Sequence, residues 1–196
     1  MLSKAGFPAC PKEKTHVPPY HSAREGVPEA SKPVLDAVQK QLGVVPNMFR
    51  LIAQSPAALQ GFAANNGALG KTLDVKTRER IALAVAQVNG CDYCLSAHTY
   101  LGLNLAKITP EEVALNRQGK SSDTKANAAV NFAAKVVRER GHISSADVNT
   151  VRDAGFTDGQ IVEILAVTAE NIFTNLLNVV AETDIDFPVI HAGEAV

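Results

Sequence analysis

The residues best suited to chemistry in this chain are two cysteines in the segment Cys91-Asp92-Tyr93-Cys94. A Cys-x-x-Cys pair is typical of redox-active dithiols and of zinc sites. His98 follows Cys94 by four residues. On a helix this spacing places two side chains on the same face, with their Cβ atoms about 5–6 Å apart. The pattern therefore predicts an imidazole that exchanges a proton with the Cys94 thiol.

A structural zinc site is disfavoured because it requires four ligands, commonly from two such pairs. Cys10 lies about eighty residues before Cys91, and no second pair exists. The remaining histidines show no ligand spacing with one another: His16, His21, His142 and His191. A thioredoxin-like site needs a βαβ unit, and strand patterns are otherwise missing. These two readings stay open as minor alternatives; we expect a redox dithiol with no metal and no cofactor, and Cys10 as a bystander thiol.

Two consecutive helices are expected to position the pair. Residues 77–88 form an apolar run that suits a buried strand or a buried helix, and its length and alanine content favour helix. Asn89-Gly90 makes a break, and helical spacing resumes over residues 91–103. Both cysteines would then lie in the first turn of the second helix. Free amides and the helix dipole favour a thiolate there, so we expect a lowered pKa for both thiols.

Folding these helices against each other brings Glu79 towards His98. Counted from Gly90, Glu79 lies eleven residues up one helix and His98 eight residues down the other. At 1.5 Å per residue their axial offset is about 4.5 Å, which a glutamate side chain spans directly or through one water. We predict that Cys94, His98 and Glu79 act as thiol, base and orienting carboxylate. Cys91 remains to resolve the oxidised sulfur.

Helical signals continue along most of the chain and predict an all-α fold. Further helices are expected at 33–42, after Pro46, from Pro56, from Pro110, and over 122–140, 145–154 and 160–181, with caps at Ser31, Ser55, Thr109, Ser144 or Ser145, and Thr157. Six of the ten prolines fall within the first 33 residues. We therefore divide the chain into a Pro-rich arm (1–32), a helical domain (33–183) and a tail (184–196). Asn171, Asn175 and Asn178 interrupt the last helix and are assigned to interhelical hydrogen bonds.

Composition excludes several classes of partner. The chain of 196 residues carries 19 basic and 20 acidic residues with no long run of one sign. It therefore offers no stripe for nucleic acid and no polybasic patch for a membrane. Residues 1–15 lack the apolar stretch of a signal peptide, and no segment holds the roughly 20 continuous apolar residues of a membrane span. We expect a cytoplasmic protein, where thiols stay reduced.

The arrangement of Glu79, eleven residues, Cys91-x-x-Cys94, three residues and His98 resembles the signature of the alkylhydroperoxidase D (AhpD) family, within the carboxymuconolactone decarboxylase-like superfamily. Residues 43–50, Gly-Val-Val-Pro-Asn-Met-Phe-Arg, are similar to a segment of its peroxidase-related members. The resemblance implies an AhpD-like all-α fold and a homo-oligomer, a trimer or hexamer. It also implies hydroperoxide reduction in which Cys94 attacks the peroxide and Cys91 resolves it. Tyr93 stands where some members carry histidine, and we interpret it as a pocket wall.

The first functional hypothesis is therefore an alkylhydroperoxidase-type enzyme that reduces hydroperoxides through the Cys91/Cys94 disulfide, which an external dithiol then reduces. A lactone decarboxylase of the same superfamily is the second hypothesis, although such an enzyme would not need a redox pair. A non-enzymatic redox-sensing protein is the third. Peroxide turnover with a supplied dithiol distinguishes the first hypothesis from the other two.

Overall fold

The computed structural model describes residues 26–193, and within this range the regular elements are all helices. The all-α prediction is confirmed. After a short 3₁₀ helix, η1 (Glu29–Ser31), the elements are α1 (Lys32–Leu42), α2 (Asn47–Ile52), α3 (Pro56–Leu69), α4 (Val75–Asn89), α5 (Asp92–Asn104), α6 (Pro110–Arg117), α7 (Thr124–Arg138), α8 (Ser145–Asp153) and α9 (Asp158–Val180). Cys10 and most of the Pro-rich arm lie outside the described residues.

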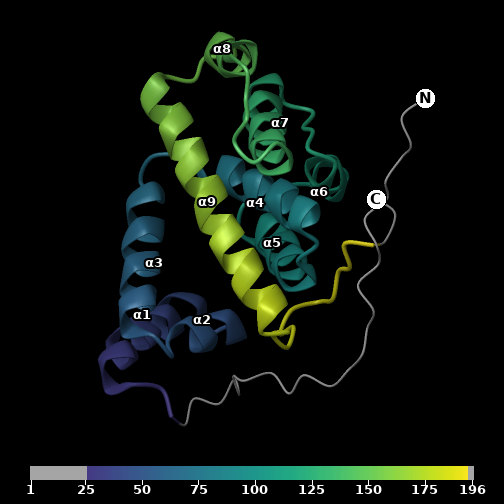
Figure 1. Ribbon diagram of the computed structural model, residues 1–196. Coiled ribbons are helices and arrows are strands. Elements are labelled where there is room, and N and C mark those ends of the chain that lie inside the picture. The colour runs from purple at the N-terminus through teal and green to yellow at the C-terminus, as the bar shows by residue number, and fades with distance from the viewer. Residues whose placement is uncertain (1–25, 194–196) are drawn as a thin grey trace, which may run out of the picture.

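The central element is α4, which packs against α5, α6, α7 and α9. Figure 1 shows the long helix α9 crossing the molecule diagonally, with α3 on one side and α4 and α5 on the other. Every residue from Ile81 to Ala86 is buried. Because neighbours cover this stretch of α4 on all sides, residues 81–86 are apolar without a helical period. The surrounding helices thus explain why periodicity alone could not distinguish a strand from a helix.

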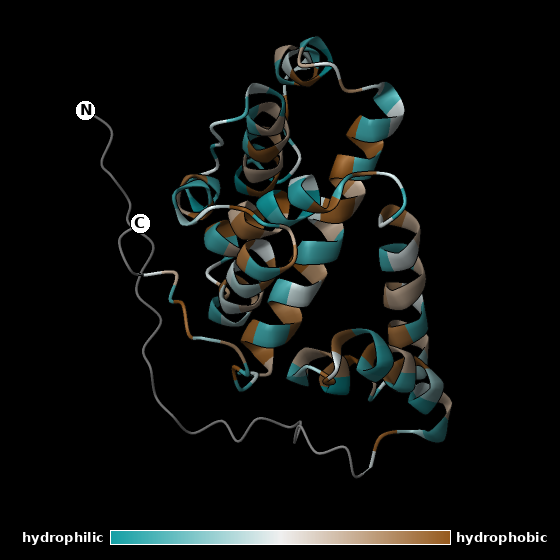
Figure 2. Ribbon diagram, turned by 180° about the vertical axis from the view of Figure 1, so that it is seen from behind, coloured by the Kyte–Doolittle hydropathy of each residue, from teal (hydrophilic) through white to brown (hydrophobic). Residues whose placement is uncertain are grey.

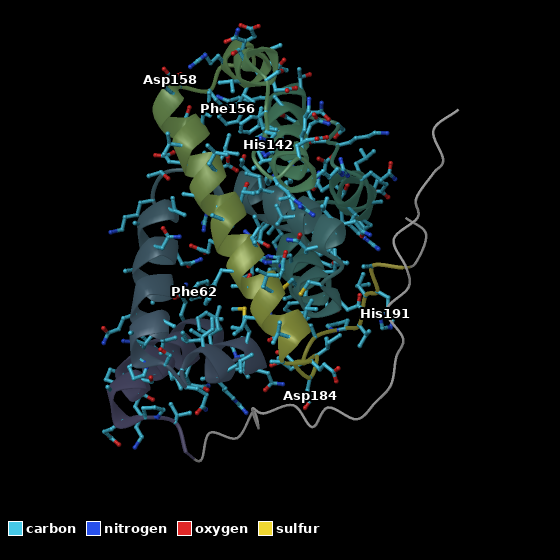
Figure 3. All side chains as sticks on the ribbon, viewed as in Figure 1. Phe62, His142, Phe156, Asp158, Asp184 and His191 are labelled. Atoms are coloured by element: carbon cyan, nitrogen blue, oxygen red, sulfur yellow. The ribbon has the colours of Figure 1, made fainter. Side chains whose placement is uncertain are left out.

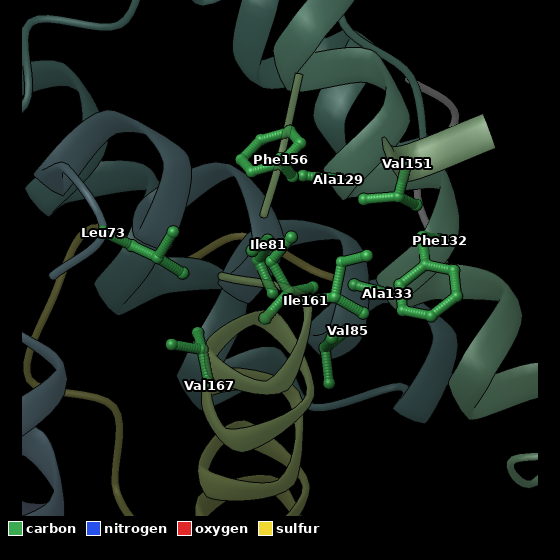
Figure 4. Close-up of a cluster of buried hydrophobic side chains, with 11 residues drawn as sticks. Leu73, Ile81, Val85, Ala129, Phe132, Ala133, Val151, Phe156, Ile161 and Val167 are labelled. Carbon is green, nitrogen blue, oxygen red and sulfur yellow. The ribbon is translucent and has the colours of Figure 1, made fainter. Parts of the chain in front are cut away.

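The largest hydrophobic cluster joins the first half of α4 to α7, α8 and α9. Ile81 and Val85 meet Phe132, Val151 and Ile164 there, and each of these side chains is at most 5% exposed. Figure 4 shows this cluster, which contains no sulfur. A second cluster surrounds the two cysteines near the other end of α4. The packing that stabilises the bundle is therefore largely separate from the packing that surrounds the thiols.

Side-chain caps set most of the helix starts. The expected caps of α3, α6, α8 and α9 are confirmed, because Ser55, Thr109, Ser144 and Thr157 each accept a backbone N–H of the first turn. The expected cap by Ser31 is wrong. Its buried hydroxyl donates instead to the carbonyl of Ala53, 2.7 Å away, so it ties α1 to the end of α2.

Hydrophobic and hydrophilic residues alternate along the helices, as Figure 2 shows, so that most helices bury one face. Helix α9 is an exception, because it also exposes large apolar side chains along its length: Val162, Leu165, Phe173, Leu176, Val179 and Val180. Among residues 26–193, no helix is both long and apolar enough to pass through a bilayer. Among the described helices, α9 therefore exposes the most large apolar side chains.

Candidate active site

The turn between α4 and α5 places Cys91 at the start of α5. Gly90 ends α4 with a left-handed backbone (φ 67°), a conformation that glycine adopts without strain. Cys91 is the N-cap residue of α5, and its Sγ accepts the backbone N–H of Cys94 at 3.3 Å. A sulfur atom thus occupies the capping position usually held by a serine or aspartate oxygen. This local geometry directs both cysteine side chains to the same side of the turn.

The two thiols are reduced, buried and hydrogen-bonded to each other. Cys91 Sγ donates to Cys94 Sγ over 2.7 Å, and the residues are 1% and 2% exposed. This hydrogen bond is the main reason that the pKa of Cys94 lies below its usual range, although burial opposes the charge. The same hydrogen bond, with burial, raises the pKa of Cys91. The expectation that the helix N-terminus lowers both pKa values is therefore wrong for Cys91, which keeps its proton to stabilise its neighbour.

Glu79 and His98 meet directly between α4 and α5. Glu79 Oε2 lies 2.8 Å from His98 Nδ1, so the offset calculated from helix geometry is closed without a water. Burial disfavours the charged imidazole, but the carboxylate of Glu79 outweighs it and raises the pKa of His98 above its usual range. The charge of His98 in turn helps to lower the pKa of Cys94. The structure therefore brings Glu79, His98 and Cys94 into one electrostatic chain.

Two asparagines of α9 complete the surroundings of Cys94. Asn178 Nδ2 donates to Cys94 Sγ at 3.4 Å, and the amides of both Asn178 and Asn175 help to lower the pKa of that thiol. Sequence reasoning assigned these residues to interhelical hydrogen bonds only. Asn175 does make one, since its Oδ1 accepts from Asn89 Nδ2 at 2.8 Å. The available signal was the recurrence of asparagine on one face of an otherwise apolar helix.

Tyr93 is a buried side chain in the same hydrophobic cluster as the two cysteines. Its hydroxyl donates to Asp186 Oδ1 at 2.8 Å and accepts the backbone N–H of Met48 at 3.1 Å. Burial is the main reason that the pKa of Tyr93 is raised, so the phenol stays protonated. Its ring meets that of Phe187 edge to face, with centroids 5.9 Å apart. Tyr93 therefore links α5 to α2 and to the segment that follows α9.

That segment, residues 184–193, forms a C-terminal strap across the start of α5. Figure 3 shows it leaving the end of α9 near Asp184 and reaching His191 beside α5. Asp92 lies 2.7 Å from His191 Nδ1 and accepts the backbone N–H of Ala192 at 2.8 Å. Ser96 Oγ accepts the N–H of Ile190 at 2.9 Å. The tail expected from the sequence thus covers the turn that carries the cysteines.

Within residues 26–193, no three His, Cys, Asp or Glu side chains gather closely enough to hold a metal ion. The arrangement instead combines a thiol whose ionised form is stabilised, a protonated thiol in contact with it, and an imidazole paired with a carboxylate. An arrangement of this kind is chemically suited to dithiol redox reactions with a nearby proton donor.

Comparison with known proteins agrees with this fold. Residues 54–139 match the model of the carboxymuconolactone decarboxylase family, and this range holds Glu79, both paired cysteines and His98. A crystal structure of an AhpD-core, uncharacterized peroxidase-related protein from Ralstonia eutropha JMP134 superimposes with a TM-score of 0.72 and 26% identity, over 86% of this chain and 94% of the other. The central part of the chain, residues 54–139, is therefore similar to the carboxymuconolactone decarboxylase family. Its helices have the AhpD-like arrangement.

Other proteins are similar to this chain in fold or over part of the sequence. A peroxidase-related protein from Silicibacter sp. TM1040 aligns with a TM-score of 0.70 and 26% identity, over 95% of this chain and all of the other. An uncharacterized protein from Haemophilus influenzae is 43% identical over 61 residues, which are 31% of this chain and half of that relative. The debrominase Bmp8, solved with 2,3,4-tribromopyrrole, shares the fold at 18% identity and a TM-score of 0.70. The fold therefore carries more than one chemistry.

Proposed function

We propose that this protein is a thiol-dependent hydroperoxide reductase of the alkylhydroperoxidase type. One observation supports it above all: the Cys94 sulfur lies 2.7 Å from a protonated Cys91 thiol and is electrostatically linked to the Glu79–His98 pair. A lactone decarboxylase has no use for two thiols in contact. A redox sensor would not need a carboxylate-oriented imidazole beside the thiolate. The site is thus better suited to turnover than to either alternative.

In the first step the Cys94 thiolate attacks the terminal oxygen of a hydroperoxide ROOH. An S–O bond forms, the O–O bond breaks, and RO⁻ leaves. Protonated His98 gives its proton to RO⁻, so the products are an alcohol, a neutral imidazole and the Cys94 sulfenic acid. Glu79 acts as a positioning residue, because it holds Nδ1 of His98 at 2.8 Å and raises the pKa of the ring. The charges of the thiolate and the imidazolium cancel in the products.

In the second step the Cys91 thiol condenses with the Cys94 sulfenic acid, which releases water and leaves a disulfide. The starting contact of 2.7 Å between the sulfurs means that little movement is needed. An external dithiol then reduces the disulfide by thiol–disulfide exchange and becomes oxidised itself. A reducing cytoplasm supplies such dithiols, which fits the expected location. The two uncharacterized, peroxidase-related proteins of similar structure support the proposal through their fold and their 26% sequence identity.

The test is peroxide consumption by the purified, reduced protein with a supplied dithiol such as dithiothreitol. Cys94→Ser should abolish reaction with peroxide. Cys91→Ser should allow one turnover and leave a sulfenic acid on Cys94 that dimedone traps. Cys10→Ser is the matched control and should behave as wild type. The assigned roles are reversed if Cys94→Ser protein still forms a peroxide-dependent sulfenic acid on Cys91 at the wild-type rate.

We also propose a homo-oligomer, with the exposed apolar face of α9 in contact with a second copy. Phe173 (41%), Leu176 (59%) and Val180 (69%) stay exposed on this face, and their spacing of three and four residues forms one continuous stripe. Light scattering should give a multiple of the 20.8 kDa chain mass. Leu176→Glu should shift the protein towards monomer. A monomeric wild-type protein at micromolar concentration would contradict the assembly.

A further inference from the structure

Two buried amide atoms beside Cys94 make no hydrogen bond of regular geometry among the described residues: Asn178 Oδ1 and Asn175 Nδ2, although the Asn175 amide is near enough to Cys94 to help lower the pKa of its thiol. Asn178 is 3% exposed and Asn175 is fully buried. A buried donor or acceptor left without a partner is costly, and native proteins keep few of them. One unpartnered acceptor and one unpartnered donor next to the same nucleophile therefore call for an explanation beyond packing.

The other end of each amide is held in place. Asn175 Oδ1 accepts from Asn89 Nδ2 at 2.8 Å, so the Asn175 amide group is anchored to the last turn of α4. Asn178 Nδ2 donates to Cys94 Sγ at 3.4 Å, which anchors the second amide to the thiol itself. The two residues are three apart on α9, a spacing that puts them on one helix face. The unpartnered atoms thus belong to fixed groups on one side of the reactive sulfur.

The third asparagine of the same helix differs from these two, and the fully buried Asn116, whose Oδ1 also lacks a partner within the described part of the chain, lies in α6 and not beside the thiols. Asn171 is 8% exposed, and its Nδ2 donates to the carbonyl of Val167 one turn earlier at 2.9 Å. Asn171 therefore satisfies its amide within α9, whereas Asn175 and Asn178 direct theirs towards α4 and α5. The difference separates a structural asparagine from two that face the thiol.

A hydroperoxide group has the complementary hydrogen-bonding pattern. Its terminal O–H is a donor, and both oxygens accept. As the O–O bond breaks, negative charge develops on the oxygen that leaves, and a fixed amide N–H directed at that charge stabilises the transition state. An acceptor and a donor side by side can therefore hold the group in one orientation.

We propose that Asn178 and Asn175 form the subsite that binds the hydroperoxide group during attack by Cys94. Asn178 Oδ1 accepts the terminal O–H, and Asn175 Nδ2 donates to the second oxygen, the one that leaves. The ligand is the –OOH group of hydrogen peroxide or an organic hydroperoxide. This inference rests on the proposed function, and it adds two substrate-binding residues from a helix outside the segment that matches the family model.

The test compares two reactions of the reduced protein at a pH where Cys94 is fully ionised. Iodoacetamide alkylates the thiolate and carries no hydroperoxide group, whereas tert-butyl hydroperoxide needs the subsite. Asn175→Ala and Asn178→Ala should each lower the ratio of the peroxide rate to the alkylation rate by about tenfold, the effect of one hydrogen bond to a group that gains charge. Asn171→Ala is the matched control and should leave the ratio unchanged. Asn175→Ser and Asn178→Ser give a second pair if an alanine variant does not fold.

Melting temperature supplies an independent readout. Asn178→Ala removes the unpartnered oxygen together with the Nδ2 donor to Cys94, so its melting temperature should stay within a few degrees of wild type even as its peroxide rate falls. An unchanged rate ratio in both alanine variants, with wild-type protein still consuming peroxide, overturns the subsite alone. If wild-type Cys94 is alkylated but is inert to tert-butyl hydroperoxide and to hydrogen peroxide, the proposed function and the subsite are both overturned.

Discussion

Glu79 of α4 and Glu112 of α6 are both glutamates with a basic partner, but their surroundings differ. Glu79 and Arg80 are neighbours in sequence, but they project into different regions. Arg80 Nε lies 3.2 Å from Glu112 Oε1, at the anchor that joins α6 to the segment before α7. The carboxylate of Glu112 also accepts hydrogen bonds from Ser121, Ser122 and Asn116. Glu79 instead pairs with His98.

The carboxylates of Glu79 and Glu112 differ in whether their partners can gain or lose a proton. Burial disfavours the charge on Glu112, but its fixed donors outweigh this and lower its pKa to about 2. That carboxylate stays ionised and holds the chain in place. The partner of Glu79 is the imidazole of His98, a group that can gain and lose a proton and whose pKa the carboxylate raises. A buried carboxylate surrounded by fixed donors is structural, whereas one paired with a titratable base can take part in proton transfer.

The largest effect should follow from removing the imidazole of His98, the proposed proton donor. We expect His98→Ala to slow the reaction of Cys94 with peroxide by about 10²–10³-fold, within the range of general acid catalysis, and to raise the pKa of Cys94 as well. Stopped-flow measurement with excess peroxide gives the rate. Glu79→Gln should slow the step less, by about tenfold, because it acts through His98. Equal rates for His98→Ala and wild type would remove the imidazole from the mechanism.

Glu112→Gln should produce the opposite pattern: lost stability with unchanged chemistry. The side chain is 7% exposed, and the change removes the ion pair to Arg80 and leaves that guanidinium poorly compensated. We expect a loss of about 3 kcal/mol in the free energy of unfolding. Urea denaturation measures the loss, and the peroxide rate of the folded fraction serves as the control. A slower reaction in the folded fraction would mean that the anchor and the thiol site are coupled.

The sequence predicts those parts of the molecule that depend on regular helix geometry. The contact between Glu79 and His98 follows from a constant rise per residue on both sides of Gly90, and the helix caps follow from short local patterns. The two asparagines at the thiol could not be placed, because their roles depend on how α9 packs about 80 residues after Cys94. The raised pKa of Cys91 depends on the distance between two sulfurs. The C-terminal strap is not helical, so no hydrophobic periodicity in its sequence could predict its path.

The pH dependence of alkylation should reveal the shared proton of the pair. Because the pKa of Cys94 is lowered, its thiolate forms above that pKa, and reactivity should be lost as the pH falls through it. The midpoint in wild type should therefore lie below the value of about 8.5 for a free thiol. Cys91→Ala removes the main stabilising hydrogen bond and should move the midpoint up by about one pH unit. Iodoacetamide rates between pH 5 and 10 measure both. An unchanged midpoint in Cys91→Ala would show that His98 and the two asparagines set the pKa without Cys91.

The smallest change in peroxide rate is expected at Tyr93. A pocket wall and a catalytic residue predict different rates when its hydroxyl is removed. Tyr93→Phe keeps the ring against Phe187 but removes the hydroxyl that bonds Asp186 and the Met48 amide. Burial keeps the phenol protonated, so it cannot serve as the base. We expect the peroxide rate to change by no more than about threefold while stability falls by about 1–2 kcal/mol.

Asp186→Asn is the matched variant, because it weakens the same bond from the strap and leaves the phenol in place. Both variants should lower the melting temperature, and both should keep the wild-type pH profile of alkylation. A peroxide rate more than tenfold lower in Tyr93→Phe, but not in Asp186→Asn, would make the phenol a proton donor to the leaving oxygen. In that case Tyr93 would do chemically what a histidine does at this position in some members of the family, and the site would hold two proton donors, Tyr93 and His98.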